Sequence, residues 1–326
     1  MKIVFFGSSE FAVDSLKMLT DSGHDILAVV TQPDRKKGRH LKVTATPVKN
    51  FAESKNIKVF QPEKVSDPAS IKYLKSLKSD LFIVVAFGEI LTKDVLEIPK
   101  IYPINLHASL LPGYRGAAPI NWAIVKGEKK TGLSVIRMNE KMDAGDIILQ
   151  RGVNIEDTDT SESLGKRLSE LGAILLIDAI RLIELDKTSF KKQTKKSSNL
   201  APRLKKEDGL IDWKKTARDI NNMIRGLVPW PCAFTILDGK ILKIWKSEIL
   251  PSQQQNEPGR IIDVQKDFFM VGCGKGILVV KELQLESGKR MDVASFMRGH
   301  KLETGTYLGE TPPPPTPNEP VSQGNG

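Results

Sequence analysis

Two polar side chains, Asn105 and His107, end an apolar segment of the chain and could carry chemistry. Alternate residues of a β-strand point to the same face, so a strand over 102–107 would present both side chains together. The amide of Asn105 can donate a hydrogen bond to a developing oxyanion, and the imidazole of His107 can exchange a proton near neutral pH. The next segment, ASLLPGYRGAAP, is rich in Pro and Gly and poor in charge, which suits a planar heteroaromatic ligand.

A third candidate, Asp143, precedes Gly145 and a further predicted strand. It could orient His107 and hold its protonated form, or act as a base itself. Residue type and spacing leave two other interpretations open: a turn aspartate bonded to nearby backbone, and a histidine hydrogen-bonded inside a turn. No Ser or Cys stands beside an evident base, and no His/Cys/Asp/Glu cluster has metal-ligand spacing. The three residues therefore indicate direct attack of an amine on an activated acyl group, without a metal.

Short apolar runs alternate with helical patterns through the first half of the chain. Strands without polar alternation, separated by helices, indicate a parallel sheet with helices on both faces, and ligands in such folds lie beyond the carboxyl ends of the strands. The predicted strands are 2–7, 26–31, 58–60, 81–86 and 102–107, followed by more exposed strands at 132–138 and 146–153. The predicted helices are 10–19, 47–55, 68–77 and 161–185, the last with Ser161 as its N-cap.

The composition changes at residue 191. Seven Lys or Arg and no acidic residue occur within 191–206, which predicts an exposed basic linker. Short strands at 241–249, 259–264, 268–271 and 277–285, with helices at 217–227 and 292–298, predict a small barrel. The expected organisation is a Rossmann-like α/β catalytic domain (1–190), the linker (191–206), an OB-fold-like β-barrel (207–310) and a disordered Pro-rich tail (311–326).

The positive charge is concentrated in the second half of the chain. The whole chain has a net charge of +10 and a pI of about 9.4. Residues 1–190 carry 27 basic and 24 acidic side chains, 191–312 carry 22 and 14, and the tail adds one acid, which gives +3, +8 and −1. Solubility is the plainer interpretation of such an excess, but a nucleic acid partner is the leading one. We expect a small-molecule catalyst in the first domain and a nucleic-acid surface on the second.

Several classes of protein are disfavoured. The turn FGSSEF after the first strand has one glycine, whereas a dinucleotide-binding turn needs three, so a nicotinamide cofactor is not expected. The two cysteines, Cys232 and Cys273, are far apart and predict a reduced, cytoplasmic protein without a disulfide framework. No apolar run approaches the roughly 20 residues of a membrane span, and the apolar run at the N-terminus is too short for a signal h-region.

The segment NLHASLLPGYRGAAPINWA resembles the catalytic motif of the folate-dependent formyltransferase family. The resemblance implies that Asn105, His107 and Asp143 are catalytic and that 10-formyltetrahydrofolate is the co-substrate. VVAFGEIL resembles the loop that embraces the pterin ring, although the family often has Tyr where this chain has Phe87. The implied folate-binding residues are Ser109, Leu110, Leu111, Pro112, Val85, Ala86, Phe87, Gly88 and Ile90.

Three further segments resemble the branch of this family that formylates methionyl initiator tRNA. TQPDRKKGRH resembles its inserted basic loop, with Arg39 at the position tied to the acceptor stem. LAPRLKKEDGLIDW resembles the stretch that opens its second domain, and GLVPWPCAF resembles the Pro-Trp-Pro segment of that domain. The resemblance covers nearly the whole chain up to about Tyr307. It implies transfer of formyl to the α-amino group of methionine on initiator tRNA, for translation initiation. The implied tRNA-binding residues are Arg35, Lys36, Lys37, Arg39, Lys205 and Lys206.

Other functions share part of this pattern. Glycinamide ribonucleotide formyltransferases, formyltetrahydrofolate hydrolases and sugar-nucleotide formyltransferases resemble the chain at the catalytic motif but do not explain its basic loop and basic second domain. A non-catalytic RNA-binding protein would explain the charge but not the Asn105, His107 and Asp143 set. We therefore expect a cytoplasmic, monomeric enzyme whose partners are folate and initiator methionyl-tRNA, with no metal, membrane or protein partner.

Overall fold

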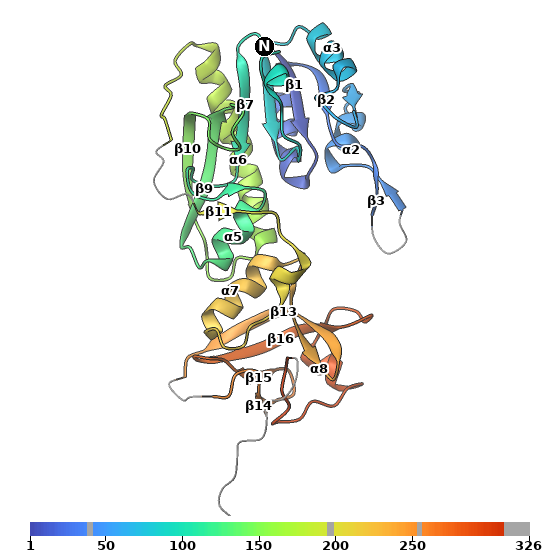
Figure 1. Cartoon of the computed structure of the whole chain (residues 1–326), viewed down its shortest axis with the longest axis vertical. Coiled ribbons are helices and arrows are strands. Elements are labelled where there is room, and N and C mark those ends of the chain that lie inside the picture. The colour runs from blue at the N-terminus through green and yellow to red at the C-terminus, as the bar shows by residue number, and fades with distance from the viewer. Residues whose placement is uncertain (38–41, 194–198, 253–255, 310–326) are drawn as a thin grey trace, which may run out of the picture. The chain divides into compact units, whose positions relative to one another are not determined.

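The computed structural model describes residues 1–37, 42–193, 199–252 and 256–309. The chain divides into two compact units, Met1–Lys205 and a second that begins at Lys206. Figure 1 shows the elements of both units, and each unit is described by itself.

A seven-stranded sheet forms the centre of the first unit, in the order β10-β9-β7-β6-β1-β2-β5. The strands from β7 to β5 are parallel, whereas β9 and β10 are antiparallel. This arrangement confirms the predicted Rossmann-like, mostly parallel sheet. The strands are β1 (Lys2–Gly7), β2 (Asp25–Val30), β5 (Val59–Phe60), β6 (Leu81–Val85), β7 (Tyr102–His107), β9 (Lys130–Arg137) and β10 (Ile147–Asn154).

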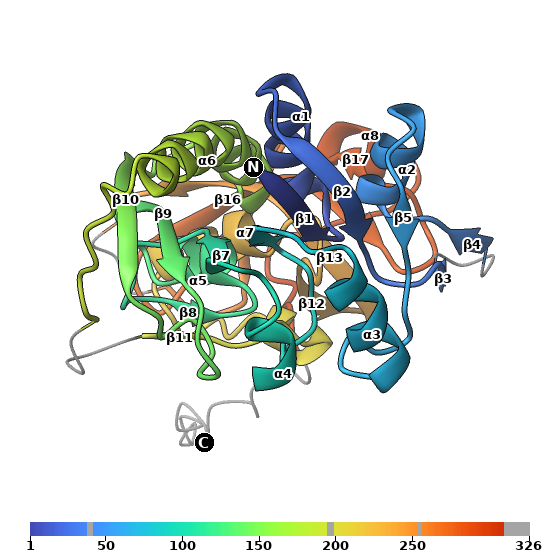
Figure 2. The same cartoon turned by 90° about the horizontal axis from the view of Figure 1, so that it is seen from above.

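Helices cover both faces of this sheet, as predicted. Side chains of α1, α2, α5 and α6 share one apolar cluster with the strands, and side chains of α3 and α4 share the other. Figure 2 shows α1 and α6 on one side of the strands and α3 and α4 on the opposite side. The helices are α1 (Val13–Asp21), α2 (Pro47–Ser54), α3 (Pro68–Ser76), α4 (Lys93–Leu96), α5 (Pro119–Val125) and α6 (Ser161–Glu184), with a short 3-10 helix η1 (Glu10–Ala12) before α1.

Four details of the first unit differ from the sequence prediction. Strand β9 is buried rather than exposed, because it lies between β7 and β10 and is covered by α6. Thr160, not Ser161, caps α6, since its hydroxyl accepts a hydrogen bond from the Ser163 backbone N–H. The basic loop after β2 contains a hairpin, β3 (Arg35–Lys37) and β4 (Lys42–Thr44), which projects from the sheet in Figure 1.

The fourth difference is that the segment predicted as an exposed linker, although most of its described residues are exposed, is paired with another strand of the first unit. Strand β11 (Leu200–Ala201) pairs in parallel with β8 (Arg115–Gly116), and Ala201 is fully buried. The Ala118 N–H donates to the Ala201 carbonyl at 3.2 Å, and the Tyr114 N–H donates to the Asn199 carbonyl at 2.6 Å. Backbone pairing therefore attaches this segment to the loop that follows His107.

An antiparallel sheet forms the second unit, in the order β12-β13-β16-β15-β14, with β17 beside β16. The segment before Gly309 bridges the two outer strands: the Ile261 N–H donates to the Thr306 carbonyl, and the Gly309 N–H donates to the Ile236 carbonyl. These bonds bring the sheet close to closure and confirm a barrel-like second domain. Its elements are η2 (Lys206–Gly209), α7 (Ala217–Leu227), β12 (Ala233–Leu237), β13 (Lys240–Leu250), β14 (Ile261–Val264), β15 (Phe269–Gly272), β16 (Ile277–Leu285), β17 (Met291–Asp292) and α8 (Val293–Met297).

Candidate active site

Asn105 and His107 lie on β7, where hydrogen bonds to β6 on one side and β9 on the other fix the backbone. His107 is 7% exposed, whereas Asn105 is half-buried. The Asn105 amide has no hydrogen-bond partner within the described part of the chain. A rigid strand therefore holds a polar amide whose donors remain available to a ligand.

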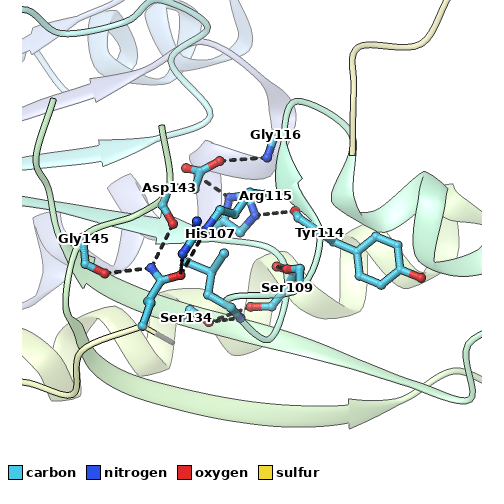
Figure 3. Close-up of polar contacts among 11 residues, drawn as sticks. His107, Ser109, Tyr114, Arg115, Gly116, Ser134, Asp143 and Gly145 are labelled. Carbon is cyan, nitrogen blue, oxygen red and sulfur yellow. Dashed lines mark hydrogen bonds and ion pairs between the residues drawn. The ribbon is translucent and has the colours of Figure 1, made fainter. Parts of the chain in front are cut away.

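The imidazole of His107 lies between a carbonyl and a carboxylate (Figure 3). Its Nε2 is 3.0 Å from the Tyr114 carbonyl oxygen, and its Nδ1 is 3.6 Å from Oδ1 of Asp143. Because a carbonyl oxygen only accepts hydrogen bonds, Nε2 carries a proton and donates. Nδ1 then faces the Asp143 carboxylate. The structure thus brings together two of the three residues predicted to be catalytic.

Asp143 reaches this position from the loop that connects β9 to β10. Its backbone has a positive φ of 50°, and its Oδ2 accepts a hydrogen bond of 2.9 Å from the Gly116 N–H. Gly116 has a φ of 127°, and a Cβ there would come within 2.4 Å of the Ala201 carbonyl oxygen, so only glycine fits. The carboxylate is therefore bound to a distant backbone amide and faces His107, rather than being bonded within its own turn.

The SLLP loop that follows β7 is held by a buried hydroxyl that was not predicted. Ser134, on β9, is fully buried and its Oγ donates to the Ser109 carbonyl at 2.7 Å. The same Oγ accepts from the Leu111 N–H at 3.0 Å and from the Gln150 side chain at 2.8 Å. Gln150 also donates to the Leu111 carbonyl at 2.9 Å. One donor and two acceptor positions of a hydroxyl are thus filled, and the loop backbone is fixed.

The side chains of the SLLP loop differ in exposure. Leu111 is buried, Leu110 and Pro112 are half-buried, and the Ser109 hydroxyl donates to the Gly113 carbonyl at 2.6 Å. The loop continues to Tyr114, whose hydroxyl donates to Glu128 at 2.7 Å. Burial, with this hydrogen bond, raises the pKa of the Tyr114 hydroxyl well above its usual value. The neutral phenol therefore anchors the end of the loop.

The second predicted folate segment, at the end of β6, alternates between core and surface. Val85 and Phe87 are buried, and Phe87 meets Phe6 edge to face with ring centroids 5.5 Å apart. Ala86, Gly88 and Ile90 are exposed. Ala86 and Gly88 have positive φ values of 46° and 87°, which turn the backbone away from the strand direction.

Ser8, at the end of β1, anchors this second segment. Its hydroxyl donates to the Phe87 carbonyl at 3.0 Å, and its N–H donates to the Ala86 carbonyl at 3.3 Å. Since Val85 and Phe87 pack inward, what this loop presents to a ligand is its main chain and the Ile90 side chain.

The residues predicted to bind tRNA are distributed over both units. Arg35 is exposed on β3, and Lys36 and Lys37 follow it on the same strand, whereas Arg39 lies outside the described residues. Lys205 and Lys206 are exposed where the first unit ends and the second begins.

Asp34 anchors the base of the basic hairpin. Its carboxylate accepts hydrogen bonds from Lys49 at 2.6 Å and from Gln61 at 2.7 Å. These bonds hold the pKa of the Asp34 carboxyl below its usual value. The Asp34 carboxylate therefore remains charged and paired with Lys49. It does not neutralise the positive charge of Arg35 on the hairpin.

The described residues contain no group of three or more His, Cys, Asp or Glu side chains that could hold a metal ion. No helix in the described part of the chain has the length and apolar character needed to cross a membrane.

Comparison with known families assigns both halves of the chain. The formyl transferase family matches residues 1–180, and the formyl transferase C-terminal domain family matches residues 203–301. The first match contains Asn105, His107 and Asp143, and the second begins close to the point where the second compact unit starts.

Relatives of known name match almost the whole chain. A methionyl-tRNA formyltransferase of Alkaliphilus oremlandii is 48% identical over 310 residues, which cover 95% of this chain and 100% of the relative. One from Geobacter sulfurreducens is 44% identical over 310 residues, covering 95% and 97%.

Solved structures share the fold at lower identity. The N-formyltransferase of Helicobacter canadensis, in complex with folinic acid and dTDP-3-aminofucose, has a TM-score of 0.65, is 21% identical, and matches over 86% of this chain and 99% of its own. The sugar 3N-formyl transferase WlaRD has a TM-score of 0.64, is 22% identical, and matches over 86% and 97%. At these identities the solved structures establish the fold, whereas the sequence relatives establish the family. The chain therefore belongs to the formyl transferase family and, over nearly its whole length, to the methionyl-tRNA formyltransferases within it.

Proposed function

We propose that this chain transfers the formyl group of 10-formyltetrahydrofolate to the α-amino group of methionine carried by initiator tRNA. The observation that supports this most strongly is the Asn105 amide, which lacks a described partner and lies on the same strand as the buried His107, whose ring faces Asp143. A binding protein has no use for such a set, whereas acyl transfer to an amine needs an oxyanion donor and a path for a proton. This activity would support translation initiation, which takes place in the cytoplasm.

The folate co-substrate supplies a formyl group already activated on nitrogen. The residues present fit a flat heteroaromatic ring, because the 86–90 loop offers exposed main chain and the SLLP loop is fixed by Ser134. We assign folate binding to Ser109, Leu110, Leu111 and Pro112 and to the 85–90 loop. The inward packing of Val85 and Phe87 restricts their contribution to backbone contacts.

The chemistry assigned to the protein is charge and proton management. Asn105 donates to the formyl oxygen as negative charge develops on it while the methionyl amine forms the new C–N bond. The proton that the amine loses passes to the His107–Asp143 pair, and a proton is returned to the folate nitrogen when its bond to the formyl carbon breaks. The contact with Gly116 keeps the Asp143 carboxylate toward the ring. No proton is gained or lost over the whole reaction.

Binding of tRNA is assigned to the basic residues outside this site. Arg35, Lys36, Lys37 and Arg39 would contact the acceptor stem, and Lys205 and Lys206 would neutralise phosphates. The net +8 of residues 191–312 supports a role of the second domain in tRNA affinity.

The experiment that tests this function is an acceptor panel. The purified chain is incubated with 10-formyltetrahydrofolate carrying labelled formyl and with methionyl initiator tRNA, methionyl elongator tRNA, glycinamide ribonucleotide or an amino-sugar nucleotide. We expect label to be transferred to initiator tRNA at least tenfold faster than to any other acceptor. Preferred transfer to the amino sugar would instead support the activity of the solved sugar enzymes, and transfer to none would reject the proposal.

A further inference from the structure

We propose that Gln193 is the positioning residue that holds Asp143 beside His107. This inference rests on the proposed function, since it assigns Asp143 a part in proton transfer. Gln193 follows α6 in the segment that the sequence predicts to be a solvent-exposed linker, and the structure places it against the catalytic loop instead.

Four hydrogen bonds surround the Gln193 amide. Its Nε2 donates to the Asp143 carbonyl at 2.8 Å and to the Gly145 carbonyl at 2.7 Å. Its Oε1 accepts from Nε of Arg115 at 3.1 Å and from Nη2 of Arg115 at 2.5 Å. Figure 3 shows the two carbonyls of Asp143 and Gly145 on one side of this contact and Arg115 on the other.

Only a glutamine amide satisfies these partners. Carbonyl oxygens accept and a guanidinium donates, so the side chain between them must present two donors on one side and an acceptor on the other. This requirement also fixes the amide orientation, because the flipped amide would place its oxygen against the two carbonyls. Glutamate would keep the acceptor for Arg115 but would lose both donors, and methionine of similar length would lose all four bonds.

The position of Asp143 depends on the hydrogen bonds that Gln193 makes to its loop. The opposite side of the loop is packed against β9, where a Cβ on Gly145 would come within 1.7 Å of the Arg137 carbonyl oxygen. Asp143 itself has a left-handed backbone (φ 50°), which is uncommon for a residue other than glycine. The 3.6 Å between Asp143 and His107 is already longer than a strong hydrogen bond, so a further shift would separate the pair.

The backbone just before Gln193 is held by bonds that do not involve its side chain. Lys191 and Ile147 exchange two hydrogen bonds of 2.9 Å, which attach the segment to the start of β10. A Gln193 variant is therefore expected to fold, and the loss of its side chain to act mainly on the Asp143–Gly145 loop.

Trp122, on α5, provides a matched control for attachment of the same segment. Its Nε1 donates to the Pro202 carbonyl at 2.8 Å, so it attaches the part of the segment that follows β11 to α5, and no hydrogen bond joins Trp122 to Asp143 among the described residues. Trp122→Phe removes this hydrogen bond and keeps most of the ring. A general loosening of the segment would affect both variants, whereas loss of Asp143 positioning would affect only Gln193.

The test compares Gln193→Met, Gln193→Glu and Trp122→Phe with wild type in formylation of methionyl initiator tRNA. We expect both Gln193 variants to lose about 10- to 100-fold in kcat, with KM for folate and tRNA within twofold, and Trp122→Phe to stay within twofold in kcat. The double variant Asp143→Asn/Gln193→Met should be no slower than Asp143→Asn, because the two residues act through one group. A Gln193→Met variant with wild-type kcat, or multiplicative losses in the double variant, would overturn the inference.

A measurement independent of activity separates this inference from the proposed function. The chain has four histidines, so ring nitrogen resonances can be assigned by substitution. Gln193→Met should shift the His107 signals and Trp122→Phe should leave them unchanged. If wild type transfers no formyl, the proposed function fails, and the His107 signals still decide whether Gln193 positions its carboxylate partner. Unchanged signals in Gln193→Met would refute the positioning role.

Discussion

Replacing Ser134 by alanine should release the SLLP loop, although Ser134 itself is not proposed to contact substrate. The substitution removes a fully buried hydroxyl, so the Ser109 carbonyl and the Leu111 N–H each lose their bond to Ser134. Gln150 also loses its bond to Ser134 but retains its bond to the Leu111 carbonyl. A buried polar group left without a partner costs about 1–3 kcal/mol, which gives about 2–6 kcal/mol for the Ser109 carbonyl and the Leu111 N–H together. The free energy of unfolding should fall by this amount.

The same loss should weaken folate binding. The variant can recover part of the lost free energy by adopting a loop conformation that does not bind folate. Each 1.4 kcal/mol recovered in this way reduces the fraction of molecules with a folate-binding loop about tenfold. We therefore expect the dissociation constant for folate to rise at least about tenfold, with KM for tRNA nearly unchanged. Urea unfolding gives the stability change, and fluorescence or calorimetric titration with 5-formyltetrahydrofolate gives the affinity.

Ser70 provides the control for this prediction. It lies at the start of α3 and is also buried, and its hydroxyl donates one hydrogen bond of 3.0 Å to the Lys64 carbonyl. Ser70→Ala should lower stability by about 1 kcal/mol and leave folate affinity unchanged. Ser134→Ala could instead lose stability and still bind folate as tightly as wild type. That result would show that the hydroxyl stabilises the fold but does not fix the SLLP loop in its binding conformation, and it would refute the prediction.

Three further predictions concern tRNA recognition and the thiols. Arg39→Ala should reduce kcat/KM for initiator tRNA about ten- to a hundredfold with folate affinity unchanged, and Arg39→Lys should restore it only in part; wild-type kinetics would exclude the assignment. Replacing Lys205 and Lys206 together by alanine should weaken tRNA binding. It should also reduce the magnitude of the slope of log affinity against log salt concentration by up to about 0.9 for each lost phosphate contact. An unchanged slope would exclude both lysines as phosphate contacts. Burial raises the pKa of Cys232 to about 11 and that of Cys273 to about 12, so at pH 8 about one thiol in a thousand or fewer is ionised. Both should react with a disulfide reagent only after unfolding, and fast reaction of the native protein would contradict their burial.

The main elements of the fold could be predicted because their signals are local. The unbroken apolar run of β6 is buried along its whole length, as a central parallel strand should be, and α7 and β16 have the bounds that their patterns predict. Strand β12 was missed because it is a five-residue segment directly after a Pro-Trp-Pro sequence. The β3–β4 hairpin was missed because its strands have three residues each and mostly basic side chains.

The site was predicted less completely, because its contacts join distant parts of the chain. Asn105 and His107 were found from their period-two spacing, but Asp143 is 36 positions beyond His107 and was assigned through family resemblance. Gln193 lies 78 positions from Arg115 and within a lysine-rich segment whose composition indicates exposure. Ser134, 25 positions from Ser109, is a serine in an apolar strand. The positions of Asp143, Gln193 and Ser134 in the sequence do not specify which groups their side chains contact.

The most direct test of the account is the single-turnover rate of formyl transfer by Asn105→Ala. Enzyme saturated with 10-formyltetrahydrofolate is mixed with methionyl initiator tRNA, and formylmethionyl-tRNA is quantified on quenching. Since the Asn105 amide is proposed to donate to the developing oxyanion, its removal should slow the step about 100- to 1,000-fold, with the folate dissociation constant changed far less. A rate within about threefold of wild type would contradict the assignment of this strand as the catalytic centre.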